Sequence, residues 1–526
     1  MKRVIKILSL FLISIFLVNL QIGAQEKQEK KVLNLTLEDC IIRTMKNNLG
    51  VSIQKLSPEL ASASVDKAKE KYYPTLNFGY TQRRNNTPSF SGLESIESTI
   101  TRYNDLNGQI SQAIPFGGSL NISLDTYKNF TTQNFQTWNP RYYSTLRFDF
   151  SQPLLQNFGY NVSNQTIILA KKNLAASEAQ LEKSLMDSIY SAEQAYWNLV
   201  YAIEDLKVKQ QSLELAQELL EKNKRSVEIG TLAPLDVLSA ESEVASRKAD
   251  IIAAQAAVKN AEDQLKTLMN MSQEEEEQYS AINPVDLPTI EKKEMSLEEA
   301  LSIALTNRPD LRSLQINLQT QQFNLTLAKN QLLPALNLTA SFFAPGLSGD
   351  RLVYLNNNPL TGVVVEVIPG PRSKSLNDAF GLKYKNWSVG MTLNLPLSNV
   401  ASRASYAQAR LNLQQAELNL RQQEQQAILE VKTALRNVRA NKERIDAYKA
   451  ARVLQEQKLA AEEEKLKVGQ STNYTVLMYQ RDLANARSTE LKALIDYTIS
   501  IANLEKALGL SLKNRNMKVV DFLKSD

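Results

Sequence analysis

The side chains that most often carry catalysis or bind metals are scarce in this sequence. It holds no histidine and one cysteine, Cys40, which excludes intramolecular disulfides, histidine acid–base chemistry and most zinc or iron sites. We interpret Cys40 as a small apolar residue on a helix face. The run from Glu274 to Glu277 is a weak candidate cation site, since a polar, acidic stretch with prolines is more typical of a solvated linker. The sequence therefore predicts no enzyme, no cofactor and no metal site.

The N-terminus has the residue order of a secretory signal. Lys2 and Arg3 precede an apolar stretch over 7–20, and the small residues Gly23 and Ala24 follow it. The alternative, a retained N-terminal helix, is disfavoured by those small residues and by the polar EKQEKK that comes next. We therefore expect residues 1–24 to be a signal peptide that is removed on export.

The charge balance argues against nucleic acid as a partner. The chain has 61 Lys and Arg against 56 Asp and Glu, and Lys2, Arg3 and Lys6 would leave with the signal. The remaining residues are nearly balanced, so no electrostatic footprint for a polyanion is expected.

The chain is internally duplicated. Residues 35–80 align with residues 295–340 at a constant offset of 260, and Gly230 aligns with Gly469 at an offset of 239. We expect a first repeat, a linker or equatorial segment, a second repeat and a C-terminal tail, over 25–271, 272–294, 295–510 and 511–526.

Each repeat opens with a helix signal that leads to a proline. Thr36 and Ser296 are hydroxyl N-caps followed by carboxylates, which favour the positive end of a helix. We expect one helix in each repeat to run from this cap to Pro74 or to Pro334, because proline ends a helix.

Apolar and polar residues alternate directly after each proline. The alternation predicts a pair of strands in each repeat, about 75–83 with 143–152 and about 335–343 with 387–395. A soluble β-sandwich would show the same pattern. Aromatic residues at the strand ends favour a membrane β-barrel instead, and no run of 18 apolar residues offers a membrane-spanning helix. Whether the hairpin at 105–127 joins the barrel is left open.

Helical periodicity then continues for about seventy residues in each repeat, which is on the order of 100 Å. We expect long helices over about 160–229 and 400–468, and return helices over about 235–270 and 474–508. Steps of four and three from Leu181 meet mostly apolar residues, the spacing of a coiled coil. A solid antiparallel coiled coil fits this seam equally well, but it leaves the alternating strands unexplained.

The order of these elements resembles the TolC family of outer-membrane efflux proteins. The motifs that carry the resemblance are SQPLL at 151–155, LNLPLS at 393–398 and the Gly-x5-Asp-Val-Leu element at 230–238. The resemblance implies a mainly α fold with a membrane β-barrel part: a trimer with a long α-helical coiled-coil barrel and a shared transmembrane barrel, to which each protomer lends four of twelve strands. It also implies partners, namely a periplasmic adaptor, an inner-membrane pump of the RND or ABC type, and outer-membrane lipid.

The resemblance also carries candidate sites. Adaptor-docking tips fall on the two turns between paired helices: Ile229, Gly230, Thr231 and Leu232, and Val468, Gly469, Gln470 and Ser471. Glycine at these places is equally explained as a helix C-cap.

The family narrows its channel with carboxylates, and this sequence departs from that pattern. Thr475 and Met478 stand at the carboxylate positions, Ser471 at that of a bridging arginine and Leu466 at that of a tyrosine, while Asp236 alone matches. We expect a constriction of apolar and neutral side chains, with Asp482 one heptad above.

The sequence thus predicts an outer-membrane channel subunit of a tripartite efflux or type I secretion system, with its helical domain in the periplasm. The alternative is a structural coiled-coil protein of the surface or periplasm without transport activity. Neither the transported substrate nor the class of pump can be inferred from the sequence.

Overall fold

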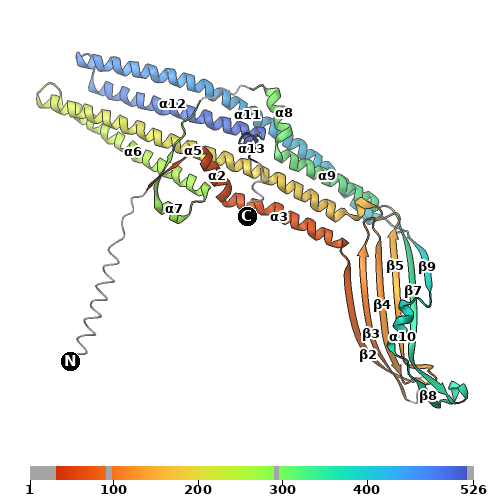
Figure 1. Cartoon of the computed structure of the whole chain (residues 1–526). Helices are drawn as coiled ribbons and strands as arrows, with labels where there is room; N and C mark the ends of the chain where they lie inside the picture. Colours follow the sequence, from red (N-terminus) through yellow and green to blue (C-terminus); the bar gives the residue numbers. More distant parts are fainter. Residues whose placement is uncertain (1–30, 90–96, 290–294, 518–526) are drawn as a thin grey trace, which may run out of the picture. The chain divides into compact units, whose positions relative to one another are not determined.

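The computed structural model describes residues 31–89, 97–289 and 295–517 (Figure 1). The expected signal peptide lies outside these residues. The described residues form two compact units, the first from those within 1–56, 181–309 and 424–526 and the second from those within 57–180 and 310–423. The chain passes from one unit to the other several times, so each unit combines segments of both repeats.

Helices make up most of the described chain. Their bounds are α2 Leu37–Asn47, α3 Leu49–Lys69, α4 Tyr160–Ser163, α5 Gln165–Glu228, α6 Pro234–Met269, α7 Gln273–Gln278, α8 Leu297–Asn307, α9 Pro309–Asn330, α10 Arg372–Phe380, α11 Val400–Lys467, α12 Asn473–Leu508 and α13 Ser511–Asn514, with short 3-10 turns η1 Glu70–Tyr72, η2 Leu355–Asn357 and η3 Pro359–Thr361. No helix in the described ranges is both long enough and apolar enough to traverse a membrane.

The helix before each strand set is broken in two, where we expected one continuous helix. Thr36 and Ser296 cap α2 and α8 as predicted, and Thr36 forms a reciprocal capping box with Asp39. Both helices end after 11 residues, because Asn48 and Arg308 adopt extended backbone. In the second repeat Pro309 explains the break, since its ring favours the first position of a new helix and disfavours helical backbone before it.

Two helices, α5 with 64 residues and α11 with 68, are long enough for about 100 Å of helix each. The apolar seam read from the sequence is buried along much of α5, including Leu181, Leu185, Ala192 and Leu199. Three apolar clusters hold the first unit together, and all draw on several helices. Its stability therefore comes from seams between helices.

The expected linker contains regular structure. Strand β6 (Tyr279–Pro284) pairs in parallel with β1 (Lys31–Leu35), and Ile282 is buried in the largest cluster. Six residues of the segment expected to be a linker or equatorial segment thus form one strand of a two-stranded sheet, although they connect the repeats along the chain.

The second unit carries a seven-stranded sheet (Figure 1). Its strands are β2 Thr75–Pro88, β3 Ser98–Ala113, β4 Ser119–Thr131, β5 Trp138–Pro153, β7 Ala335–Tyr354, β8 Val364–Ile368 and β9 Asn386–Asn394. The order is β2-β3-β4-β5-β7, with β9 on the first half of β7 and β8 on its last residues. The hairpin left open in the sequence is β3–β4, and it lies within the sheet. The resemblance implies four barrel strands for each protomer, and the sheet of the described chain has seven.

Candidate functional site

The sheet of the second unit has one apolar and one polar face. On β9, Trp387, Val389, Met391 and Leu393 alternate with Ser388, Gly390 and Thr392. Strand β7 repeats the pattern, with Leu338 opposite Met391 and Phe342 opposite Trp387. Trp387 and Val389 are 76% and 64% exposed, although such side chains ordinarily pack against something. Within the described part of the single chain, this apolar face has no cover over β9.

Both lateral edges of the sheet are open within the described chain. Strand β2 pairs with β3 and strand β9 pairs with β7, and each lacks a strand on its other side in the order found. Such an edge presents a row of unpaired backbone donors and acceptors that natural proteins cover or pair. The geometry calls for another strand at each edge.

The two turns predicted as docking tips have the same backbone design. At the first, Gly230 has φ of 75° and donates to Val227, while the N–H of Thr231 reaches Ser226 O at 2.9 Å. At the second, Gly469 has φ of 76°, and the N–H of Gln470 reaches Lys465 O at 2.9 Å. Both are Schellman caps that need glycine for its backbone conformation. A Cβ at either glycine would meet nothing within 4 Å, so crowding is not the reason.

The tips also expose apolar side chains. Ile229 is 74% exposed and Val468 is 70% exposed, while Leu232 is half-buried. Ser471 instead turns inward, and its hydroxyl donates to Glu462 at 2.6 Å. This hydrogen bond, aided by Lys465, holds the pKa of the Glu462 carboxyl below its ordinary value.

The gate candidates do not form a single cluster. Leu466 packs on an apolar cluster that also holds Val476 and Leu477, and Thr475 takes part in the N-cap of α12 through Thr472. Met478 lines a cavity of about 300 Å³ between α6 and α12. Asp236 and Asp482 are half-buried in α6 and α12. Leu466 and Thr475 thus have structural neighbours that sequence alone did not reveal.

Next to this cavity lies Arg247, a residue that the sequence did not single out. The cavity wall includes Glu243 and Arg481, and Glu243 accepts a hydrogen bond from Arg247 Nε at 3.1 Å. Arg247, which is 3% exposed, also donates to the carbonyl of Ser212 at 2.6 Å and to that of Leu477 at 2.9 Å. Burial lowers the pKa of Arg247 from its ordinary value and Glu243 opposes this. One guanidinium therefore ties α6 to α5 and α12.

A signal for Arg247 was present in the sequence. Steps of four and three from Ala240 lead through Val244 to position 247 and on to Ala254 and Leu265, and all of these are buried. A charge on an apolar seam points to a buried partner.

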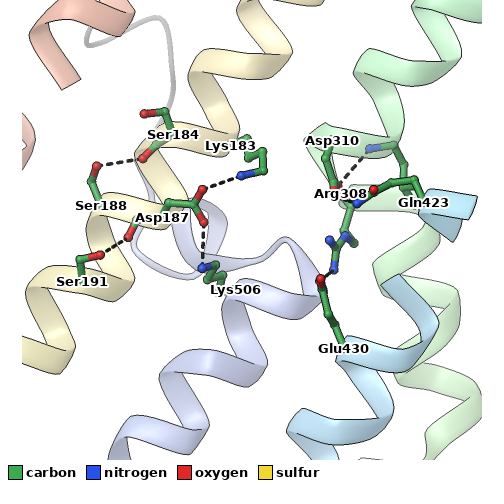
Figure 2. A network of polar contacts seen from close by, with 11 residues as sticks. Lys183, Ser184, Asp187, Ser188, Ser191, Arg308, Asp310, Gln423, Glu430 and Lys506 are labelled. Carbon is green, nitrogen blue, oxygen red and sulfur yellow. Dashed lines mark hydrogen bonds and ion pairs between the residues drawn. The ribbon is translucent and has the colours of Figure 1, made fainter. Parts of the chain in front are cut away.

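Ion pairs join the helices elsewhere in the first unit (Figure 2). Asp187 on α5 lies between Lys183 at 2.7 Å and Lys506 of α12 at 2.9 Å. Partial burial raises the pKa of Asp187, but the two lysines outweigh it and the net shift is downward. Arg308 pairs with Glu430 of α11 at 2.7 Å. In the second unit, Gln423 donates to Asp310 at 2.9 Å.

The two candidates for other chemistry have structural roles. Cys40 is fully buried, and burial raises the pKa of its thiol to about 12, so it is an unreactive core residue. The run Glu274–Glu277 forms α7, which Ser272 caps, and Glu275 lies 3.8 Å from Arg43. No group of three or more metal-ligating side chains occurs among the described residues.

Comparison with known proteins identifies the family. A family model described as "Outer membrane efflux protein" matches residues 142–271 and 300–510. The chain belongs to the outer membrane efflux protein family. The outer membrane protein TolC of Vibrio cholerae is 23% identical over 368 residues, which cover 69% of this chain and 75% of TolC. The outer membrane efflux protein BepC of Brucella suis is 21% identical, over 91% of this chain and 86% of BepC.

Solved structures agree on the fold. The CmeC outer membrane channel of Campylobacter jejuni superposes with a TM-score of 0.63 at 18% identity, covering 93% of this chain and 89% of CmeC. The expected fold class, a mainly helical TolC-like fold with long helices and antiparallel strands, is confirmed. The chain is an outer-membrane efflux channel of the kind used by tripartite efflux and secretion systems and is not an enzyme. Membership in this family implies a trimeric channel.

Proposed function

We propose that three copies of this chain form a passive export duct in which their sheets close into one transmembrane barrel. The apolar face of the sheet meets lipid and the polar face lines water. The helices form the periplasmic part of the conduit. The chain supplies no energy of its own, and transport is driven by the pump to which it is coupled.

The two-faced sheet with open edges is the observation that supports this proposal. Lipid covers exposed apolar side chains such as Val389 and Met391, and strands of neighbouring copies pair with the open edges of β2 and β9. On β7 the apolar face extends from Leu336 to Phe342, about 20 Å along a strand and about 16 Å in height at a 40° tilt. This is a large part of the apolar band of about 25 Å typical of outer-membrane barrels.

The two tips are the proposed docking site for a periplasmic adaptor, which connects the duct to an inner-membrane pump of the RND or ABC type. Ile229 and Val468 are exposed apolar side chains at rigid turns, a combination that suits hydrophobic contact with the end of another helical hairpin. On the helices next to these tips we propose a constriction of the duct without a ring of carboxylates. It includes Asp236, Leu466, Thr475, Met478 and Asp482.

A pair of matched substitutions on β9 tests the barrel. Val389→Asp places a charge on the proposed lipid face and Ser388→Asp places one on the proposed water face, one residue away. A lysine or arginine facing lipid costs about 2–4 kcal/mol near the middle of the membrane and an aspartate costs less, whereas a lumen-facing charge is tolerated. We therefore expect Val389→Asp to reduce the heat-modifiable trimer recovered from outer membranes, and Ser388→Asp to leave its yield unchanged.

Two results would contradict the proposal. One is equal loss of trimer in both variants, which would mean that the faces are not differently solvated. The other is recovery of the wild-type chain as a monomer extracted without detergent, which would favour the structural coiled-coil alternative.

A further inference from the structure

The hairpin β3–β4 occupies the interior of the sheet. Strand β2 follows α3 and its 3-10 turn, and strand β5 leads toward α5, yet β2 and β5 are not neighbours. Strands β3 and β4 lie between them and pair with each other over thirteen positions, from Thr101 with Thr131 to Ala113 with Ser119. At 4.8 Å per strand spacing, β2 and β5 are about 14 Å apart.

The inserted hairpin has the length of a membrane strand. β3 has 16 residues and β4 has 13, and a tilted strand needs about 9–11 residues to cross the apolar layer. A surface loop outside the barrel wall would not need two strands that are each long enough to cross the membrane.

One row of the apolar face runs through the hairpin. In the register found, one row crosses six strands from β2 to β9 and every member is apolar: Leu76, Ile110, Ile122, Phe148, Phe342 and Trp387. Ile110 and Ile122 are the members from the hairpin. They share the environment of the row, which in a membrane wall is lipid.

The adjacent row, on the other face, is polar at all six positions: Thr75, Ser111, Asn121, Asp149, Ser341 and Ser388. On this face, Arg83 lies 4.6 Å from the ring centre of Tyr103, Tyr103 lies 6.2 Å from Tyr127, and Tyr127 stacks on Tyr143 at 5.4 Å. A continuous line of side-chain contacts therefore joins β2 to β5 across both hairpin strands.

Strand direction also suits closure at this width. The ladder is antiparallel at every step from β2 to β9, and six strands is an even number, so β2 of one copy runs antiparallel to β9 of the next. A fully antiparallel barrel with an even number of strands is the rule for bacterial outer-membrane barrels.

We infer that the β3–β4 hairpin is part of the membrane wall, so that each protomer contributes six strands and the trimer closes an eighteen-stranded barrel. This inference rests on the proposed function, because it assumes that three copies close edge to edge. With a strand spacing of 4.8 Å and a tilt of 40°, eighteen strands give a backbone diameter of about 36 Å and twelve give about 24 Å. The outer-membrane mouth thus accepts wider cargo than a twelve-stranded barrel does.

Engineered disulfides can determine the strand order. Both cysteine pairs are made in a Cys40→Ala background. Asn77→Cys with Gln109→Cys can form a disulfide between β2 and β3 in the observed register. Asn77→Cys with Arg147→Cys can form a disulfide between β2 and β5 only if the hairpin lies outside the wall. A disulfide needs Cα atoms about 4.4–6.8 Å apart. Trypsin cleaves at Arg83, Arg84 and Arg102, so disulfide-linked peptides identify each bond by mass spectrometry.

We expect trimers in membranes to oxidise the first pair and not the second. A bond between positions 77 and 147 would overturn the inference and leave the duct itself intact. The control is Asn337→Cys with Thr392→Cys, which are neighbours on β7 and β9 with or without the hairpin in the wall. Failure of this control would show that the sheet is not assembled, which contradicts the proposed function.

A second measurement tests closure between copies. Asn77→Cys on β2 is combined in turn with cysteine at Ser388, Gly390, Thr392 or Asn394 on the polar face of β9. A chain-to-chain crosslink at one of these positions, together with the 77–109 bond, supports eighteen strands. The 77–109 bond without any chain-to-chain crosslink would overturn closure through these edges.

Discussion

Arg247 offers the most direct test of how the helices of the first unit are held together. Its guanidinium hydrogen-bonds to Glu243 of its own helix, to the Ser212 carbonyl of α5 and to the Leu477 carbonyl of α12. Arg247→Met keeps a long side chain and removes all three hydrogen bonds. The perturbation therefore isolates the polar contribution of one residue to the joining of three helices.

The expected magnitude follows from the burial of its partner. The Glu243 side chain is 18% exposed, so Arg247→Met leaves a mostly buried carboxylate without its nearest cation. Removing one partner of a buried pair typically costs about 3–5 kcal/mol. Arg481 remains 4.0 Å from Glu243, so we expect about 3 kcal/mol. At about 2–4 °C per kcal/mol for a domain of 150–250 residues, the melting temperature falls by about 6–12 °C.

The assay is the apparent melting temperature from far-UV circular dichroism, in one detergent and at one protein concentration. Two controls separate the causes. Arg247→Met combined with Glu243→Leu removes both charges and should recover part of the loss, and Arg247→Lys keeps the charge but lacks the planar fork that reaches two carbonyls. A fall of less than about 2 °C for Arg247→Met, or a double variant as unstable as the sum of the two single variants, would refute the reasoning.

Three further outcomes are expected. Because Asp187 has a lowered pKa in the folded protein, its stabilising effect is present above the ordinary value of 3.8 and is lost as the pH falls through the folded value. Asp187→Asn should therefore lower the melting temperature at pH 7 but not below about pH 3. The control Asp263→Asn, at an exposed site, should change the melting temperature little at either pH. A loss of stability in Asp187→Asn that does not depend on pH would exclude the ion pairs as its cause. Gly469→Ala should destabilise the tip by about 1 kcal/mol because of the positive φ at this position, and Gly469→Asn should destabilise it by less. Hydrogen exchange of the turn amides measures both effects, and equal effects would argue against backbone strain. Trivalent cations should not block single channels tightly from the periplasmic side, since the expected constriction lacks a carboxylate ring, and tight block would show that the gate prediction is wrong.

Local periodicity explains what the sequence predicted well. The helical seam from Leu181 and the strand alternation after Pro74 and Pro334 depend on neighbours a few residues away, and glycine at 230 and 469 is the ordinary stop of a helix. Each is a property of a short segment, so each can be recognised without knowledge of the rest of the fold.

Features that depend on distant partners were missed. Strand β6 is too short and too polar to stand out, and its pairing with β1 joins residues about 250 positions apart. The three partners of Arg247 lie on three helices, and only its position on the apolar seam of α6 distinguishes it from a surface arginine. The hairpin at 105–127 could be recognised from the sequence. Its place inside the sheet depends on pairing with β2 on one side and β5 on the other, and no local pattern encodes that pairing.

Two groups of exposed apolar residues, those of the sheet and those of the tips, differ in their surroundings. Those of the sheet, such as Phe78 and Trp387, belong to rows that cross several strands and end at open edges, so covering them takes a continuous apolar phase and further strands. Those of the tips, Ile229 and Val468, are single side chains on capped turns whose backbone is already satisfied. A small complementary surface can cover them. The first kind therefore calls for lipid and more copies of the chain, while the second calls for a different protein that approaches the turns.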